Sequence, residues 1–504
     1  MRLDPKRLAS LALCLLSLPL AGAQGKETPT FSEHIAPIIY ENCTTCHRPG
    51  QIGPFALTDY PSVKRRARLI AEVTGDRIMP PWHADPCDVE YANDRSLSPE
   101  QISLIADWFA AGMPEGDPAK TPALPVFHEG WQMGNPDQIA TMAEPFTVPA
   151  EGPDIYRMFV IPLNRDRDTW VKGVEFRPGD PKVVHHILYF LDTTGKARDY
   201  DAREPGPGFR DKSSGGFRYM GGWDIGTQPS ELPYGLRWFI PKGADLVVQV
   251  HYHPSGKQTT DQSSVGFHFS DQPTSRPWSI IPVPPHFGIL QGIDIAAGEK
   301  ERIEKASFVI PADCEAFSVN AHAHYLGKRM EMTATFKDGT TRRLLRTSRW
   351  DFKWQEDYSF KEPVKLPAGT RLDVLMSYDN SESNPNNPTR PPRRVRWGPA
   401  TTDEMGSITL AVMFDTKEQK EATHEALRVF LANQLIDRLL EGKEDAFGLA
   451  GQIGNAKSLE EARRPLLALD LNQDSLLSPD ERIPAVQFIL QGDFIRRLGA
   501  IGFD

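Results

Sequence analysis

The sequence predicts a multidomain, mainly β protein with an α-helical N-terminal domain, two antiparallel β-sandwich domains and a helical C-terminal region. The chain has 504 residues, enough for roughly three to four domains that each bury a core. Its 44 prolines and 39 glycines indicate many turns, which are typical of β-rich domains. Short alternating apolar runs fill the middle of the chain, whereas apolar residues spaced three and four apart occur towards both ends.

The composition is that of an ordinary globular protein. Hydrophobic residues make up 39% of the chain and charged residues 25%. The formal net charge of −10 argues against nucleic acid as a partner, because proteins that bind it present a basic surface.

Residues 1–23 have the pattern of a secretion signal peptide. Basic residues precede an apolar run from Leu8 to Leu20, and the small residues AGA follow as a cleavage site. The apolar run is too short to span a bilayer, and Cys14 would leave with the signal. We therefore expect an exported, periplasmic or extracellular protein with no membrane span after signal removal.

Residues 24–120 predict the helical domain, and its main feature is the motif CTTCH. The spacing of Cys43, Cys46 and His47 is that of covalent c-type haem attachment, in which both thiols form thioethers and the histidine ligates iron. A zinc half-site is the alternative, but no second CxxC or matching histidine pair follows.

Two helices are predicted on either side of this motif. Thr30 and Glu33 have the spacing of a capping box at the start of the first helix. The segment 98–116 has helical apolar spacing and is predicted to close the domain.

The second axial ligand of the iron is expected from the segment RIMPPWHADP. Met79 precedes Pro80 and Pro81, which hold an extended loop, and a thioether in such a loop completes a His/Met haem. His83 is the rival ligand. Iron with both axial positions filled accepts and passes single electrons but does not readily bind oxygen, so catalysis is expected elsewhere.

Cys87 and Cys314 remain after signal removal and haem attachment. In an exported protein they form either a disulfide or two separate buried thiols, and the sequence favours neither arrangement.

The linker GDPAKTPALP separates the helical domain from a long β-rich part. Short runs between Gly, Pro and Asn turns predict two β-sandwiches, over residues 126–275 and 276–415. Three histidine pairs lie on these runs, and they are His185 with His186, His251 with His253, and His322 with His324.

Spacing decides which of these histidines can share a metal ion. Residues two apart on a strand point to the same face, as in the second and third pairs. The adjacent His185 and His186 point to opposite faces of a regular strand, so they can share one ion only at a strand end or a distortion. Imidazole groups without nearby carboxylates or cysteines favour copper, and zinc is also compatible.

The segments VVHHILYF, VQVHYHPSG, HAHYLGKRM and TTDEMGSITL occur in this order within residues 126–415. In sequence and order they resemble the copper type II monooxygenases, the group of peptidylglycine α-hydroxylating and dopamine β-monooxygenases. The N-terminal part is similar to the cytochrome c domain that is fused to such proteins in bacteria.

This resemblance implies two jelly-roll domains that each bind one copper ion. The first ion would be held by His185, His186 and His251, with His253 in a supporting position. The second would be held by His322, His324 and Met405, since Met405 matches the DEM motif of the family and the nearer Met330 and Met332 do not.

The resemblance also implies a monooxygenase that hydroxylates a C–H bond of a small organic substrate with molecular oxygen. The soft thioether of Met405 favours copper(I), so oxygen would be activated there, while the all-histidine site would supply the second electron. The haem would deliver electrons that other members take from ascorbate, and its own donor would be a small reductant or a redox protein.

The peptide-amidating members anchor their substrate with groups that this chain lacks. Asn320 stands where they have an arginine, and Ser407 and Thr409 stand where they have Asn and Tyr. A peptide-amide product is therefore not expected. Other candidates for the pocket, which also fit as turn or core residues, are Trp354, Gln355 and Asn380.

The mismatch at these positions also motivates a second hypothesis, a non-catalytic electron-transfer or copper-handling protein. Such a protein would keep the haem and the copper ions but would have no organic substrate.

Residues 416–504 predict helices around an EF-hand-like loop, DLNQDSLLSPDE. Ser475 replaces the usual glycine of the loop, and a polar turn is the alternative to a structural calcium site. The candidate calcium ligands are Asp470, Asn472, Asp474, Leu476, Ser478 and Glu481.

Overall fold

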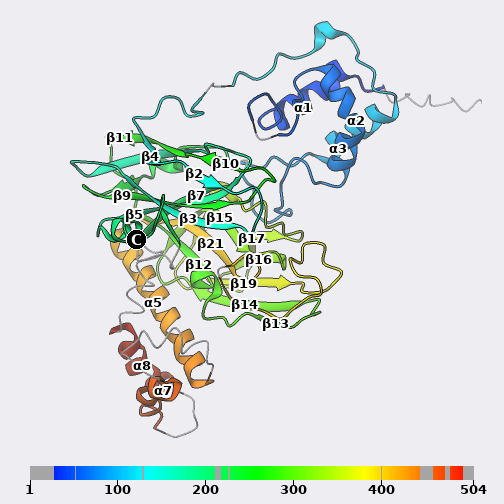
Figure 1. Cartoon of the computed structure of the whole chain (residues 1–504). Helices are drawn as coiled ribbons and strands as arrows, with labels where there is room; N and C mark the ends of the chain where they lie inside the picture. Colours follow the sequence, from blue (N-terminus) through cyan, green and yellow to red (C-terminus); the bar gives the residue numbers. More distant parts are fainter. Residues whose placement is uncertain are drawn as a thin grey trace, which may run out of the picture.

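The computed structural model describes residues 28–51, 53–127, 130–210, 217–224, 227–398, 400–442, 458–471 and 477–491. This part of the chain is mainly β, with several antiparallel sheets and a few helices (Figure 1). The predicted signal peptide lies outside the described residues. In the part of the chain that is described, no helix combines the length and apolar character needed to cross a membrane.

The N-terminal region is helical, as its apolar spacing predicted. Its elements are η1 (Phe31–Ile35), α1 (Ala36–Asn42), α2 (Tyr60–Gly75), α3 (Pro99–Ala110) and η2 (Pro118–Lys120). Phe31, Ile39 and Trp108 are buried together in their shared core. Ser98 and Gln101 cap α3 reciprocally, which fixes where the helix begins.

The capping box predicted at Thr30 and Glu33 is wrong. Thr30 makes no side-chain cap to the following helix, and its backbone N–H donates instead to His34. Glu33 pairs with Lys120, which ties the start of the region to its end.

Two antiparallel sheets follow, and we call them the first sheet pair. Their strand orders are β1-β11-β4-β8 and β6-β3-β9-β5-β7. The elements are β1 (Gln138–Thr141), β2 (Phe146–Val148), β3 (Ile155–Pro162), β4 (Thr169–Arg177), β5 (Val184–Asp192), α4 (Lys196–Asp201), β6 (Phe209–Arg210), β7 (Arg218–Asp224), η3 (Pro233–Gly235), β8 (Trp238–Ile240), β9 (Asp245–Tyr252), β10 (Thr259–Asp261) and β11 (Ser264–Ser270). One core joins the two sheets, with Val171 and Phe267 from one and Ile187 and Val248 from the other.

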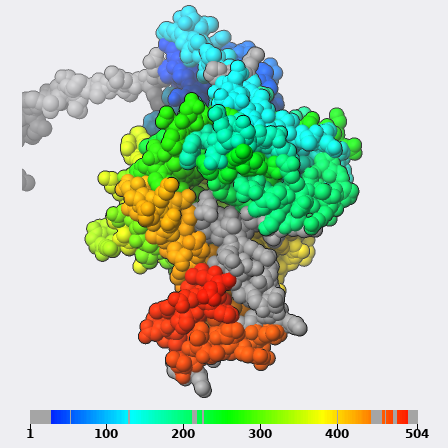
Figure 2. All heavy atoms as spheres, turned by 90° about the vertical axis from the view of Figure 1, so that its left-hand side faces the viewer, coloured from blue at the N-terminus to red at the C-terminus, as the bar shows by residue number. Residues whose placement is uncertain are grey.

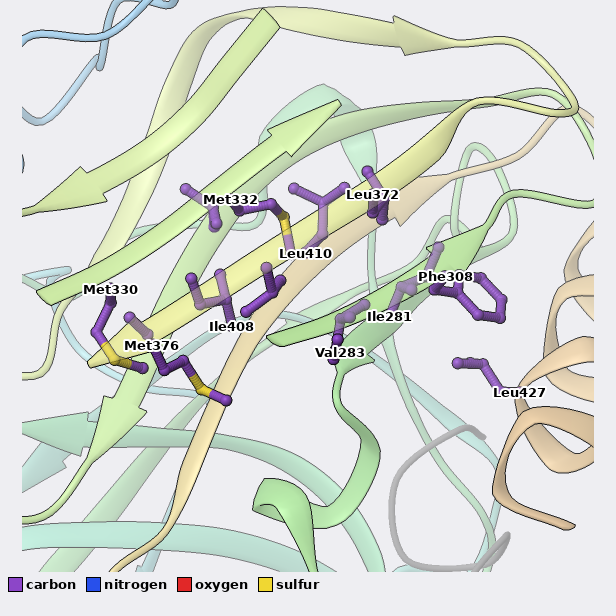
Figure 3. Packing of buried hydrophobic residues seen from close by; sticks show 14 of the residues in the cluster. Ile281, Val283, Phe308, Met330, Met332, Leu372, Met376, Ile408, Leu410 and Leu427 are labelled. Atoms are coloured by element: carbon purple, nitrogen blue, oxygen red, sulfur yellow. The ribbon is translucent and has the colours of Figure 1, made fainter. Parts of the chain in front are cut away.

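The second sheet pair has the strand orders β12-β21-β15-β18 and β14-β19-β16-β17. Its elements are β12 (Trp278–Val283), η4 (Pro285–Gly288), β13 (Asp294–Ile295), β14 (Arg302–Val309), β15 (Cys314–Ala323), β16 (Gly327–Thr335), β17 (Thr341–Thr347), β18 (Asp357–Leu366), β19 (Arg371–Tyr378), β20 (Val395–Arg396) and β21 (Gly406–Met413). Figure 3 shows side chains of both sheets meeting in one core, among them Ile281 and Leu410 opposite Met332 and Leu372.

The C-terminal helices extend this second core. They are α5 (Lys417–Leu440), α7 (Leu459–Leu467) and α8 (Pro479–Gln491). Leu427, Leu431 and Leu435 of α5 are fully buried at a spacing of four residues, and Ile489 of α8 joins them. Figures 1 and 2 show these helices at the end of the molecule opposite the N-terminal helices.

The loop between α2 and α3 leaves the N-terminal core and packs on the second sheet pair. Trp82, Ala84 and Val89 belong to the core of that pair rather than to the core of the helices. Tyr91 forms a β-bridge with Phe360 of β18. The helical region is thereby anchored to one particular edge of the second sheet pair.

Cys87 and Cys314 are both free thiols, so the structure has the separate thiols of the second arrangement, with Cys314 buried and Cys87 half-buried. Burial raises the pKa of both thiols, for Cys314 to about 12.

Candidate metal and haem sites

Three histidines of the first sheet pair meet at one point. His185 and His186 follow Val184, the first residue of β5, and His251 lies opposite them near the end of β9. One potential ligand atom from each residue lies within 4.8 Å of the others. The Nδ1 atom of His186 lies 3.2 Å from that of His185 and 3.3 Å from that of His251.

A distortion of β5 brings the adjacent histidines together. The pairing of β5 with β9 shifts register between Val184 and His186, directly after the strand begins. Such a bulge redirects a side chain to the other face of the sheet. The geometry that the sequence required for two adjacent histidines to share one ion is therefore present.

Asp154 orients the third histidine of this cluster. Its Oδ2 atom lies 2.9 Å from His251 Nε2, and its Oδ1 atom lies 2.7 Å from Nδ1 of the exposed His253. Because a carboxylate accepts, Nε2 of His251 carries the proton and Nδ1 keeps its lone pair towards the cluster. Burial opposes ionisation of Asp154, but its bonds to the two histidines outweigh burial and lower its pKa to about 2.

The second histidine pair lies at the end of β15, in the second sheet pair. The ring centroids of His322 and His324 are 5.3 Å apart. His322 Nδ1 lies 2.5 Å from Gln355 Oε1, and His324 Nδ1 lies 3.1 Å from the Asp403 carbonyl. Both oxygens accept, so each Nδ1 carries the proton and each Nε2 is the unprotonated donor atom.

Burial keeps four of these imidazoles neutral. It lowers the pKa of His322 to about 3 and the pKa values of His185 and His324 to about 4. The pKa of His186 is also well below its usual value, because burial is reinforced by the neighbouring imidazoles. A neutral imidazole is the form that ligates metal ions.

Glu404 joins the two chain segments that carry the second set of predicted ligands. Its fully buried carboxyl accepts from the backbone N–H groups of His324, Leu326 and Met405. Tyr378 donates to the Met405 carbonyl at 3.0 Å. Burial raises the pKa of Glu404 to about 8, although these three N–H groups favour its charged form.

The structure separates the three candidate methionines. Met330 and Met332 are fully buried in the core of the second sheet pair, among the side chains shown in Figure 3. Met405 instead lines a cavity together with His322 and His324. Of the three, Met405 is thus the one whose surroundings fit a metal ligand.

Phe352 lies between the two histidine clusters. Its ring stacks on His185 at 5.7 Å between centroids and meets His324 edge-on, also at 5.7 Å. Tyr325 packs against the same ring at 4.5 Å. One aromatic side chain therefore contacts both candidate metal sites.

The haem-attachment residues lie at the end of α1 and in the turn that follows. Cys43 and Cys46 are free thiols, and burial raises the pKa of Cys43 to about 12. His47 Nδ1 lies 3.1 Å from the Phe55 carbonyl, which leaves Nε2 as the donor atom for iron. Gly53 passes so close that a Cβ atom there would lie 2.8 Å from His47 Nδ1.

Met79 and His83 occupy different surroundings. Met79 lines the same cavity as Cys46 and His47, to which apolar side chains such as Ile70 also contribute. His83 lies 3.0 Å from the Arg349 carbonyl through its Nδ1 atom, in the contact with the second sheet pair. The structure thus supplies the thioether, rather than this imidazole, to the haem-attachment cavity.

A single continuous cavity of about 3230 Å³ connects the sites. Residues that line it from the three sites are Cys43, Cys46, His47, Met79, His186, His322, His324 and Met405. The donor sets fit the expected groups, since paired thiols with an adjacent imidazole and a thioether suit a c-type haem. Three imidazoles, or two imidazoles and a thioether, suit copper. Zinc is compatible with the imidazole ligands but not with the thioether.

The residues predicted to face a substrate divide into two groups. Asn320, Trp354, Gln355, Ser407 and Thr409 line the cavity. Asn380 is instead a core residue, the alternative that the sequence left open, because it is fully buried and its amide donates to backbone carbonyls, including Ala296 at 2.9 Å and Arg393 at 2.7 Å.

The candidate calcium loop is described only at its two ends. Asn472, Asp474 and Leu476 lie outside the described residues. Glu481 accepts from the backbone N–H groups of Leu471 and Ser478, so its carboxylate already bridges the two ends of the loop. Calcium binding there stays a prediction.

Sequence reasoning missed Asp154 and Glu404 as parts of these sites. Asp154 lies outside the histidine motifs, and nothing in its local sequence indicates that it reaches His251. Glu404 was within the DEM motif, where its position next to Met405 was the available signal.

Comparison with known proteins does not identify a family. No protein-family model and no curated protein matches the chain. PNGase F, a glycosylasparaginase from Flavobacterium meningosepticum, is 9% identical over 56% of this chain and 97% of its own, with a TM-score of 0.25. The VP2 subviral particle of infectious bursal disease virus is 9% identical over 57% of this chain and 73% of its own, with a TM-score of 0.16. Similarity this low supports no conclusion about fold or function.

Proposed function

We propose that this chain is an exported copper-dependent monooxygenase that hydroxylates a C–H bond of a small organic substrate with molecular oxygen, using electrons relayed by its own c-type haem. The observation that carries the proposal is that one cavity is lined by the haem-attachment motif, by His322, His324 and Met405, and by His186 of the three-histidine cluster. The domain layout that accompanies it is a cytochrome c domain, two jelly-roll copper domains and an EF-hand-like C-terminal region.

The proposed ligands follow from the donor atoms that face each site. His185, His186 and His251 would hold one copper ion, and His322, His324 and Met405 would hold the other. Bound copper supplies the one-electron chemistry that activates oxygen, and the haem supplies single electrons.

The remaining groups of the chain prepare the Met405 site. Gln355 and the Asp403 carbonyl fix which imidazole nitrogens face inward. Glu404 holds the His324 and Met405 segments together, so loss of either contact would misplace a ligand. The neutral amide of Asn320 on the cavity wall donates to the Glu356 carbonyl at 3.1 Å and offers no charge that would anchor a substrate carboxylate at that position.

Metal analysis of the mature, full-length protein is the first test. The proposal predicts two copper ions and one haem per chain. The second test reduces this protein without oxygen, mixes it rapidly with oxygen and candidate substrates, and follows the return of copper(II).

Met405→Leu should abolish rapid copper reoxidation and product formation while leaving the haem spectrum intact. Met332→Leu is the matched control, because a volume-conserving change in the core should cost less than about 1.5 kcal/mol. Unchanged reoxidation in Met405→Leu would contradict the role given to this residue. If copper(I) in the wild type never reoxidises, the protein is a non-catalytic electron-transfer or copper-handling protein.

A further inference from the structure

The loop that carries Met79 continues into a rigid contact with the second sheet pair. Backbone hydrogen bonds run from Asp85 N to Arg346 O at 2.7 Å and from Ala92 N to Ser359 O at 2.7 Å. A third runs from Lys361 N to Glu90 O at 2.8 Å. Because backbone groups make these contacts, the haem-attachment region has a fixed position relative to β18.

Arg95 makes a polar contact between the haem-attachment region and the segment next to His322. Its Nε atom donates to the Pro81 carbonyl at 2.9 Å, and its terminal nitrogen donates to Glu356 Oε2 at 2.7 Å. The two charged side chains are largely buried, with 26% of Arg95 and 16% of Glu356 exposed. Charge-assisted bonds in such surroundings are short and directional.

Both ends of this contact reach proposed ligands. Pro81 lies two residues after Met79, the proposed second axial ligand. Glu356 directly follows Gln355, whose Oε1 atom lies 2.5 Å from His322 Nδ1. Gln355 is itself held in place, because its amide donates to the Phe352 carbonyl at 3.0 Å.

Arg95 also lies close to the haem-attachment motif. The guanidinium of Arg95 is close enough for its positive charge to act on the Cys46 side chain. Arg95, Cys46 and Glu356 all line the shared cavity. The guanidinium is thus within electrostatic reach of the haem side while hydrogen-bonded to the copper side.

We propose that Arg95 and Glu356 couple the haem to the His322 site. The route follows the chain from Met79 to Pro81, crosses the hydrogen bonds of Arg95 to Glu356, and continues through Gln355 to His322. This inference rests on the proposed function. A haem held by Cys43, Cys46 and His47 would give up one electron, its iron passing from ferrous to ferric, and copper(II) held by His322, His324 and Met405 would take up that electron and become copper(I). No proton or other atom is transferred. The His322 site would then be the first acceptor of electrons from the haem.

The test measures electron transfer within the full-length protein rather than its activity. Haem in the copper(II)-loaded protein is photoreduced without oxygen, and the decay of the ferrous haem absorbance is followed. The wild type should show a decay that requires copper and does not depend on protein concentration. If this copper-dependent phase is absent in the wild type, the proposed function itself fails.

The variants then test the coupling alone. Arg95→Gln should slow the decay several-fold, and Arg95→Lys should slow it less, because lysine keeps the charge but not both hydrogen bonds. Asn93→Ala is the matched control, since Asn93 bonds Asp357 and Ser359 in the same interface without touching this route. Copper content and the copper spectrum should be unchanged in all of them. The haem potential is measured in each variant, so that the rates are compared at equal driving force.

An unchanged rate in Arg95→Gln would overturn the inference, and so would equal slowing in Asn93→Ala, since that result would indicate a loosened interface. If Arg95→Gln fails to load haem or copper, Glu356→Gln is used to test the inference instead. That variant should retain the bond to Arg95 without the ion pair and should still slow the decay, and a wild-type rate would overturn the inference.

Discussion

Asp154 orients a histidine of the all-histidine cluster, although it is not itself one of the proposed ligands. It bonds the Nε2 atom of His251 and thereby leaves Nδ1 facing His186. Tyr156 stacks on the same imidazole at 4.3 Å and limits its rotation. The ring is thus fixed in both tautomer and orientation, which is what carboxylate partners of metal-binding histidines provide.

Replacing Asp154 by Asn should weaken copper binding at the all-histidine site by about 10- to 100-fold, because the imidazole loses its charged partner. Copper titration against a competing chelator measures this affinity. His253→Gln is the control, because His253 bonds the same carboxylate but is exposed and lies outside the cluster. Equal weakening in the control would contradict the assignment.

Glu356 should give the protein a measurable pH dependence. Burial raises its pKa to about 7, although Arg95 acts in the opposite direction. Between about pH 4.5 and 7 the folded state therefore holds a proton that the unfolded state has released. The stability gained from this proton is present below that range and is lost as the pH rises through it.

Glu356→Gln removes this titration, and it also weakens the contact with Arg95. The stability of the variant relative to the wild type should therefore improve between about pH 5 and pH 8, by at most about 3 kcal/mol. Thermal unfolding of both proteins across this range measures the difference. A difference that stays constant with pH would show that the pKa of Glu356 is the same in the folded and unfolded proteins, which would contradict the prediction.

At the scale of the element, strand spacing predicted which histidines come together better than it predicted which other residues contact them. His322 and His324 are two apart and come together, as a regular strand requires. His185 and His186 needed a register shift in β5, which alternation alone cannot reveal. Gln355 reaches His322 from the turn before β18, and such long-range contacts carry no signature in local sequence.

Helix α5 shows that the C-terminal region is structurally part of the second sheet pair. Its Leu427, Leu431 and Leu435 share one core with strands β12, β14 and β21. The helical spacing was readable from the sequence, but the partner of its apolar face was not. Packing against a particular sheet depends on tertiary contacts rather than on periodicity.

Leu435→Ala should destabilise the second sheet pair by about 2–5 kcal/mol, because Leu435 is fully buried and the change leaves a cavity. Chemical denaturation followed by tryptophan fluorescence measures the loss. Glu425→Ala on the exposed face of α5 should stay within about 0.5 kcal/mol of the wild type. A similar loss of stability in both variants would indicate that the measurement reports formation of α5 and not its packing on the second sheet pair.

At the scale of the whole molecule, the arrangement of the three sites could not be read from the sequence. The sequence indicated helical ends, a β-rich middle and the histidine and cysteine motifs, and the described structure has these elements. Their meeting in one cavity depends on the loop 82–91, which packs in the second core. Nothing in the composition of that loop marks it as the connection between two regions.

The most direct test of the account is the rate at which oxygen reoxidises the ferrous haem of the full-length protein, compared between copper-loaded and copper-free samples. The account predicts fast reoxidation only with copper bound, fast reoxidation in Met332→Leu, and slow reoxidation in Met405→Leu. If the copper-free protein reoxidises as fast as the copper-loaded protein, the haem reacts with oxygen by itself, and its proposed role as the electron inlet to the copper sites is contradicted.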